Sequence, residues 1–162
     1  MKTRTTHHYL LPALAAVAFA LSAAAPASAA EPHHTIVRAD AVKWGPAPPS
    51  LPSGAKAVVL AGNPGAAGPF TLRLKLPVGY TIPPHRHSSD ERVTVISGAV
   101  NIGAGEKLDR AAAARLPQGD FVNLPAGMAH YAFVAAETII QVSANGPFDV
   151  IYVNAADDPR RQ

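Results

Sequence analysis

Two histidines separated by one residue, His85 and His87, are the first feature of the sequence that could carry chemistry. Side chains two residues apart on an extended strand point to the same face, so two imidazoles at this spacing can converge on one cation. Glu91 follows a short polar turn and can return to that face, and His130 begins another expected strand. Taken singly, each histidine is more often a structural or surface residue. Together, three imidazoles and one carboxylate suit a divalent iron, manganese, zinc, nickel or cobalt ion.

The residues around these four candidates follow a regular spacing. These residues form two blocks. In the first block, Gly79 and Gly98 lie on either side of His85, His87 and Glu91. In the second block, Gly119, Pro125 and Gly127 precede His130. The blocks resemble the paired signature of the cupin superfamily, GxxxxxHxHxxxExxxxxxG and GxxxxxPxGxxHxxxN. Every fixed position of the first block is met. The second departs only at its end, where Val134 stands in place of the usual Asn, which is not a metal ligand.

This resemblance covers roughly residues 70–153 and implies that His85, His87, Glu91 and His130 are the metal ligands. It also implies an all-β fold, a single cupin-like jelly-roll β-barrel (a double-stranded β-helix) that encloses a small cavity. Four protein ligands on a six-coordinate ion would leave two positions for water, oxygen or substrate, as a catalytic metal requires. Cupins with this ligand set include dioxygenases, oxalate-degrading enzymes, isomerases and non-catalytic binders, and the fold does not choose among them.

Short β-type runs separated by Gly and Pro are the elements that would position the candidates, a pattern typical of a sandwich or barrel. Expected strands cover residues 35–38, 57–61, 70–76, 92–96, 99–102, 121–124, 130–134, 138–142 and 149–153. Pro83-Pro84 forces an extended approach to His85. The one helical candidate is the Ala-rich segment 106–116, where apolar residues recur every four positions, although the same stretch could form an irregular loop between strands.

Strand alternation also predicts which residues face the cavity. The expected lining includes the residues that alternation places on the same strand face as Glu91 or His130, and one polar residue in an otherwise apolar strand. These residues are Val93, Val95, Met128, Ala132 and Gln141. An edge or interface position is the commoner role for a residue such as Gln141. This wall suits a small, partly apolar ligand. No nucleophile–base pair remains once the histidines are assigned to the metal, which argues against serine-type hydrolysis.

Composition limits the remaining classes of function. The 162 residues are 48% hydrophobic and 15% charged, which predicts one domain with a packed core and excludes a disordered tail protein. The absence of cysteine excludes disulfides, thiolate catalysis and Cys-ligated zinc. The net charge of +3 is scattered along the chain, so nucleic acid is not an expected partner. A small-molecule ligand is expected instead, and the resemblance implies a homodimer paired through a sheet face.

The N-terminus has the layout of a secretory signal peptide. Lys2 and Arg4 precede an apolar run over residues 9–21 and an Ala-Ser-Ala cleavage site at residues 27–29. That run is shorter than the roughly 20 residues of a membrane span, so we expect cleavage after Ala29 or Ala30 and no membrane span afterwards. Without a twin arginine, the general secretory route to the periplasm or the extracellular space is expected.

The expected organisation therefore has four segments. Residues 1–30 are the signal peptide, 31–55 a Pro-rich arm with a short strand, 56–156 the cupin barrel and 157–162 a C-terminal tail. Two hypotheses of function follow. The favoured one is an exported metal-dependent oxidoreductase of the dioxygenase type, acting on a small organic substrate. The alternative is a non-catalytic periplasmic module for a metal or small ligand, or a cupin isomerase or decarboxylase. A general acid or base beside the metal would favour an enzyme, but alternation turns Asp90 away from the site.

Overall fold

The computed structural model describes residue 2 and residues 34–161. The expected apolar run and cleavage site lie outside these residues. The expected strand over residues 35–38 is wrong, because this segment pairs with no other strand and leads into a short 3-10 helix, η1 (Ala39–Ala41). None of the helices in the described part of the chain is long and apolar enough to cross a membrane.

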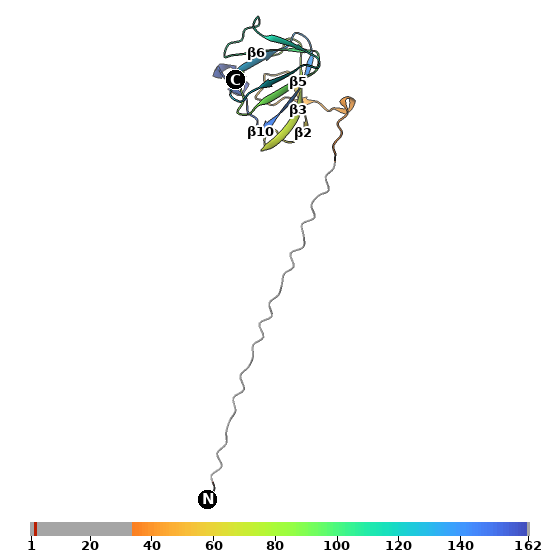
Figure 1. Ribbon diagram of the computed structural model, residues 1–162, viewed down its shortest axis with the longest axis vertical. Coiled ribbons are helices and arrows are strands. Elements are labelled where there is room, and N and C mark those ends of the chain that lie inside the picture. The colour runs from red at the N-terminus through yellow and green to blue at the C-terminus, as the bar shows by residue number, and fades with distance from the viewer. Residues whose placement is uncertain (1, 3–33, 162) are drawn as a thin grey trace. The chain divides into compact units, whose positions relative to one another are not determined.

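One antiparallel sheet has six strands, four of which are labelled in Figure 1. Their spatial order is β1 (Gly45–Pro46), β2 (Lys56–Ala61), β3 (Gly68–Leu76), β10 (Thr138–Gly146), β5 (Glu91–Ser97) and β8 (Phe121–Leu124). The central pair, β3 and β10, is in register over its whole length, from Gly68 opposite Gly146 to Leu76 opposite Thr138. The short strand of the N-terminal arm is therefore β1, at the edge of this sheet.

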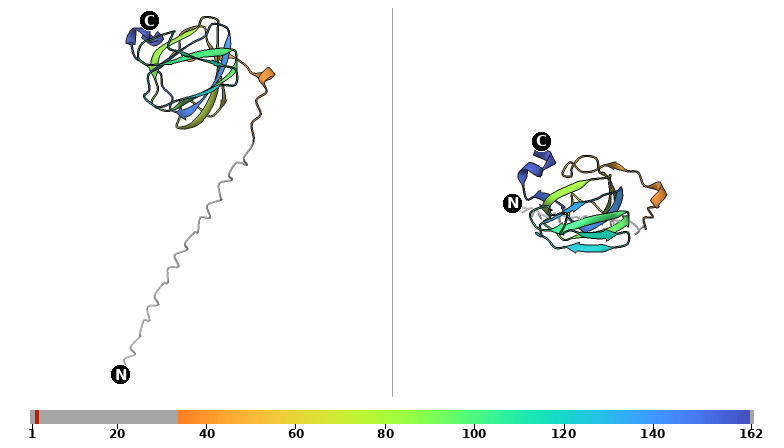
Figure 2. Two further views of the ribbon diagram at one scale, coloured as in Figure 1. Left: turned by 45° about the horizontal axis from the view of Figure 1, so that its top comes forward. Right: turned by 90° about the horizontal axis from the view of Figure 1, so that it is seen from above.

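The second antiparallel sheet has five strands and faces the first, as the two views of Figure 2 show. Its order is β11 (Ile151–Tyr152), β4 (Thr81–Arg86), β9 (His130–Phe133), β6 (Ala99–Ala104) and β7 (Ala114–Pro117). The 3-10 helices η2 (Ala155–Asp157) and η3 (Pro159–Arg161) follow β11. Two facing antiparallel sheets confirm the predicted jelly roll, although the sheets stay separate and do not close into one continuous barrel.

The core lies between the two sheets and follows from strand alternation. In β3, Phe70, Leu72, Leu74 and Leu76 are buried, and the residues between them are partly exposed. Burying a side chain of this size contributes about 1.5–3 kcal/mol to folding. Because β10 alternates in the same phase, its inward side chains meet those of β3 over the same core.

The expected helix over residues 106–116 is wrong. Residues 105–113 form an irregular loop, and β7 occupies the end of the segment. The side chain of Asp109 accepts hydrogen bonds from the backbone N–H groups of Ala111 and Ala112, which gives the backbone a turn in place of a helix. The loop covers the outer face of the five-stranded sheet: Tyr131 donates to the Asp109 carbonyl at 2.7 Å, and the Arg110 guanidinium lies 4.3 Å from the centre of the Phe133 ring.

Two glycines of the motif blocks take the left-handed backbone conformation. Gly98, between β5 and β6, and Gly127, before β9, have φ angles of 78° and 76°. A side chain is strained in this left-handed region. At Gly98 an added Cβ would also lie 2.7 Å from the Glu137 carbonyl oxygen, so the turn needs glycine for space as well.

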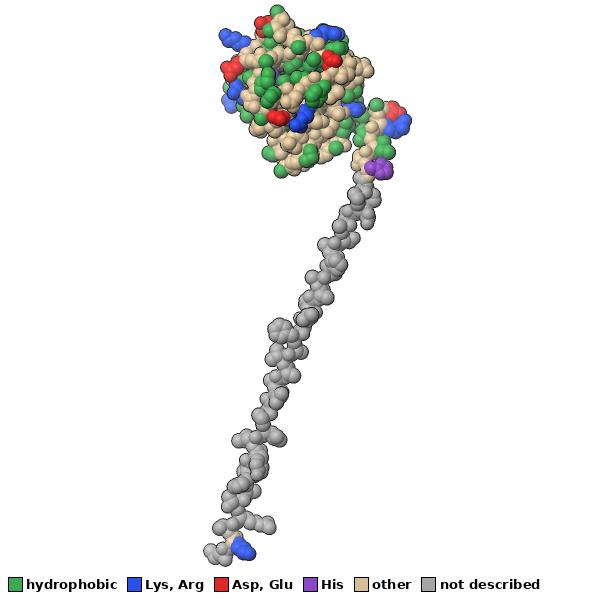
Figure 3. All heavy atoms as spheres, in the orientation of Figure 1, with side chains coloured by type: hydrophobic (Ala, Val, Ile, Leu, Met, Phe, Trp, Pro, Cys, Tyr) green, Lys and Arg blue, Asp and Glu red, His purple; other side chains and the backbone are tan. Residues whose placement is uncertain are grey.

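Apart from the buried Glu91 and Asp158, the charged side chains of residues 34–161 are at least partly exposed. On the face shown in Figure 3, both signs are interspersed and do not gather into a patch of one sign. Near the C-terminus, Arg160 contacts both carboxylate oxygens of Asp158 at 2.7 and 2.8 Å and donates to the Val150 carbonyl at 2.9 Å. This pair fastens the end of the chain beside β11.

Candidate metal centre

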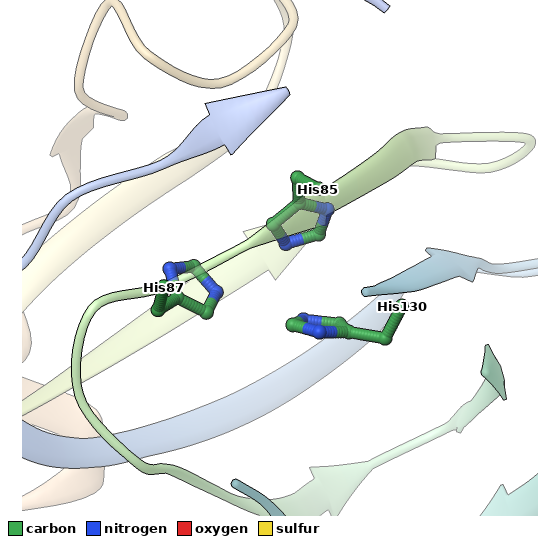
Figure 4. Close-up of side chains that lie close together, drawn as sticks. All are labelled: His85, His87 and His130. Atoms are coloured by element: carbon green, nitrogen blue, oxygen red, sulfur yellow. The ribbon is translucent and has the colours of Figure 1, made fainter. Parts of the chain in front are cut away.

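Three histidines from different parts of the sheet converge, as Figure 4 shows. His85 lies near the end of β4, His87 follows just after that strand, and His130 begins β9. His85 and His130 are register partners across the two strands. One ring nitrogen from each histidine lies within 4.8 Å of the others, and all three residues are buried. This arrangement could hold a metal ion.

The orientation of each ring is set by a hydrogen bond to the backbone. In all three histidines Nδ1 faces a carbonyl oxygen, which can only accept, so Nδ1 carries the hydrogen and Nε2 carries the lone pair. The acceptors for His85, His87 and His130 are the carbonyls of Pro83, Asp149 and Met128, respectively. Metal-bound histidines are oriented in this way in proteins. The Nε2 lone pair of each histidine is therefore available to bind a cation.

Two of the Nε2 atoms have no hydrogen-bond partner. Nε2 of His87 and Nε2 of His130 are buried and make no hydrogen bond, a state that costs about 1–3 kcal/mol per group. Glu91, at the start of β5, places Oε2 3.3 Å from both. A divalent cation near these atoms would satisfy both nitrogens and the carboxylate. The residues therefore fit a metal of the type that binds imidazole and carboxylate.

The electrostatics of the cluster favour the metal-binding protonation state at His85 and Glu91 and oppose it at His87. Burial lowers the pKa of His85 to about 3, and the neighbouring His130 and His87 act in the same direction. Burial would also lower the pKa of His87, but the Glu91 carboxylate outweighs it and raises this pKa above its ordinary value. Burial would raise the pKa of Glu91, but His130 and His87 bring it well below its ordinary range. At neutral pH, His85 is neutral and Glu91 ionised, as metal ligation requires.

The two motif blocks are joined by direct hydrogen bonds. Gly127 donates its N–H to the His87 carbonyl at 2.8 Å, and Ala126 donates to the Asp90 carboxylate at 2.9 Å. Asp90 thus faces away from the histidines and holds the turn that leads to His130. Val134, where the superfamily pattern has Asn, is buried in the core and leaves the cluster unaffected.

Asp149 is a residue that the sequence did not single out. Its carbonyl orients His87, and its side chain accepts hydrogen bonds from the backbone and hydroxyl groups of Ser88 at 2.8 and 3.0 Å. Phe148 stacks on the His87 ring, with a centroid distance of 4.3 Å and an interplanar angle of 19°. These contacts span about sixty residues of sequence, so no local pattern could have found them.

A cavity of about 440 Å³ lies between the sheets and contains the cluster. Among the residues that line it, the polar ones are Ser50 and the four members of the cluster. The other described residues of the lining are apolar or glycine, and none of them is Lys, Arg or Asp. The volume lies within the usual range for small-molecule sites.

Two of the five expected lining residues, Val93 and Ala132, face this cavity. Val95 is buried in the core but does not line the cavity, and Met128 lies in the turn before β9 with 36% of its surface exposed. Gln141 faces the other way, because Ile140 and Val142 on either side of it point inward. Its side chain accepts a hydrogen bond from Arg73 on the outside of the sheet.

The N-terminal arm contributes the part of the lining that alternation could not predict. Pro46, Pro48, Ser50 and Leu51 border the cavity. Two buried tyrosines hold the arm there: the Tyr152 hydroxyl donates to the Ser50 carbonyl at 2.8 Å, and the Tyr80 hydroxyl donates to the Pro52 carbonyl.

Comparison with known proteins agrees with this architecture. Residues 35–161 match the family described as "Domain of unknown function (DUF4437)". The polyketide cyclase RemF from Streptomyces resistomycificus has a TM-score of 0.62 and 18% identity, covering 78% of this chain and 90% of its own. A candidate acetylacetone dioxygenase from Methylibium petroleiphilum has a TM-score of 0.61 and 19% identity, over 80% and 87% of the two chains. KdgF from a Halomonas species has a TM-score of 0.53 and 19% identity, over 70% and 96%.

No curated protein matches the chain. At such low identities the solved structures support the fold alone. That fold, with its two facing sheets and its histidine cluster, is the fold of the cupin superfamily. The chain belongs to the DUF4437 family within it.

Proposed function

We propose that this protein is an exported metal-dependent oxidoreductase of the dioxygenase type that acts on a small organic substrate. One divalent ion is held by His85, His87, Glu91 and His130. The observation that carries the proposal is the position of this cluster, at which three oriented imidazoles and one carboxylate meet inside an apolar cavity of about 440 Å³. A metal there would supply Lewis-acid or redox chemistry to a molecule bound between the apolar walls.

The chain's own residues have separate roles in this proposal. The backbone carbonyls orient the three rings, so that Nε2 of each points to the ion. The apolar walls bind the hydrocarbon part of the substrate. A candidate dioxygenase of the same fold is consistent with this chemistry, although likeness of fold is an analogy and does not define a reaction.

A binding module without turnover is the second candidate, and one observation favours it. Outside the cluster, no described residue of the cavity lining has an acid or base side chain. The same observation argues against an isomerase or decarboxylase, because these reactions move protons and need a positioned acid or base.

Metal analysis followed by oxygen uptake distinguishes these candidates. We expect the protein purified from its own compartment to contain one equivalent of iron, manganese, nickel, cobalt or zinc, and to consume oxygen with a member of a panel of small phenols, diketones and dicarboxylates. His85→Ala and His130→Ala should lose both metal and uptake. Unchanged metal content in these two variants would refute the site. Full metal content without uptake across the panel would favour the binding module.

Export is proposed from the N-terminal sequence. The exported protein should begin at Ala30 or Glu31, because a signal peptidase cleaves after small residues such as those at positions 27–29. Intact-mass measurement of protein from the periplasm or the medium tests this. A mass that still includes residues 1–20 would contradict it.

A further inference from the structure

The charges of the cavity indicate which kind of ligand it can accept. The charged or chargeable side chains that line it all belong to one cluster, and the rest of the described lining has Ser50 as its only polar side chain. Three neutral histidines, one carboxylate and a divalent ion together carry a single positive charge. Within residues 34–161, no lysine or arginine lines the cavity to balance further negative charge.

We propose that the ligand of this cavity is a monoanion with its charged oxygens at one end and an uncharged apolar body, such as the enolate of a 1,3-dicarbonyl compound. This inference rests on the proposed metal site. A monoanion neutralises the metal cluster. A dianion would leave one negative charge in an apolar space, and burying an uncompensated charge is costly.

The walls extend this argument to the body of the ligand. Aliphatic and aromatic side chains from both sheets and the arm, among them Leu51, Leu72, Val93, Val142 and Phe148, surround the space beside the cluster. A hydroxylated or carboxylated body would lose its hydrogen bonds to water there and find few replacements. Sugars, sugar acids and dicarboxylates are therefore poor candidates, and an alkyl or phenyl substituent is favoured by burial.

Acetylacetone and malonate form a matched pair of probes. Both present two oxygens separated by three carbons, but the enolate of acetylacetone has one negative charge and malonate has two. Isothermal titration of the metal-loaded protein should give an affinity for acetylacetone enolate at least about tenfold higher than for malonate. Benzoylacetone, which adds a phenyl ring, should bind about tenfold more tightly than acetylacetone.

A charge placed at the cavity edge tests the physical cause. Val59 lines the cavity and is 49% exposed, so a lysine there can keep its ammonium group near both cavity and water. Val59→Lys should reduce the preference for the enolate over malonate several-fold. The matched control is Val78→Lys, because Val78 is 73% exposed and does not line the cavity. This control should keep the preference of the unsubstituted protein.

The outcomes separate the two levels of the proposal. Protein that binds no metal would overturn the proposed function, and the ligand inference with it. Metal-loaded protein that binds malonate as tightly as acetylacetone would overturn the ligand inference alone, as would a preference that responds equally to Val59→Lys and Val78→Lys.

Discussion

Adding a divalent ion to the metal-free protein should raise its melting temperature at pH 8. The ion binds the folded cluster and hardly binds the unfolded chain, so it stabilises the fold by mass action, by about 2.7 kcal/mol at a concentration one hundred times the Kd. For a folded unit of this size that corresponds to roughly 10 °C. The structure supports an effect at pH 8, because burial holds the pKa of His85 at about 3 and Glu91 is ionised, so both residues can bind the ion without losing a proton.

The metal-induced rise in melting temperature should become smaller as the pH falls, and the directions of the pKa shifts explain this change. His87 has a raised pKa, so its proton stabilises the metal-free fold fully below pH 6.5, and this contribution is lost as the pH rises through the raised value. At higher pH the metal replaces this proton on the ring nitrogen of His87. His85 has the opposite effect on stability, because its pKa is lowered to about 3. As the pH falls from 6.5 to 3, the unfolded chain binds a proton at His85 and the folded chain does not, so the fold loses stability.

The number of competing protons is also limited by the structure. Three histidine ligands with ordinary pKa values would give a slope approaching three protons per ion. Because burial keeps His85 neutral above about pH 4, this histidine has no proton to release to the metal over the useful range. The logarithm of metal affinity should therefore fall by at most two per pH unit. Each competing proton removes about 1.4 kcal/mol per pH unit.

Calorimetric melts from pH 5 to 8, with and without saturating manganese or zinc, measure this directly. His85→Ala and His130→Ala should lose the metal-induced gain at every pH. His34→Ala is the matched control, because His34 is exposed and outside the cluster, and it should keep the gain. A gain that is absent at pH 8, or constant from pH 5 to 8, would refute histidine ligation.

Two further variants test the framework around the site. Gly103→Ala should destabilise the fold by about 1–3 kcal/mol, since its Cβ would enter the buried ring of Tyr131 on the neighbouring strand. An unchanged urea midpoint would show that the ring has room to move. Tyr152→Phe should cost about 1 kcal/mol in the same assay, because it removes the hydrogen bond to the Ser50 carbonyl, while metal content stays unchanged. Loss of metal in this variant would show that the arm supports the cluster itself.

Much of the fold was predictable because strand alternation is a local property. Residues 70–76 and 121–124 were expected as strands and lie in β3 and β8, respectively. β4 was expected only as an extended approach, because Pro83-Pro84 interrupts its alternation. The segment 106–116 misled the prediction, because its alanines favour a helix whereas pairing with β6 and the Asp109 turn favour other structure.

The candidate site was predictable at the level of its residues but not of its surroundings. The spacing of the two blocks singled out the three histidines that the fold brings together, along with Glu91. Met128 was expected to line the cavity because it lies two residues before His130. Gly127 instead turns the chain before β9 begins, so strand alternation does not extend to Met128. The carbonyl of Asp149 and the arm residue Ser50 reach the site through tertiary contacts, which carry no local signal.

The cluster is unfavourable for stability in the metal-free protein, and this is the strongest physical reason to regard it as functional. Two buried Nε2 atoms lack hydrogen bonds, and an ionised Glu91 lies beside them in the interior. Apolar side chains of similar volume at these positions would remove the unsatisfied groups and the buried charge, which is often neutral or stabilising. A protein without disulfides has no crosslink to offset such a cost. A bound cation would give both unpaired Nε2 atoms and the Glu91 carboxylate a favourable contact, so a ligand accounts for the arrangement.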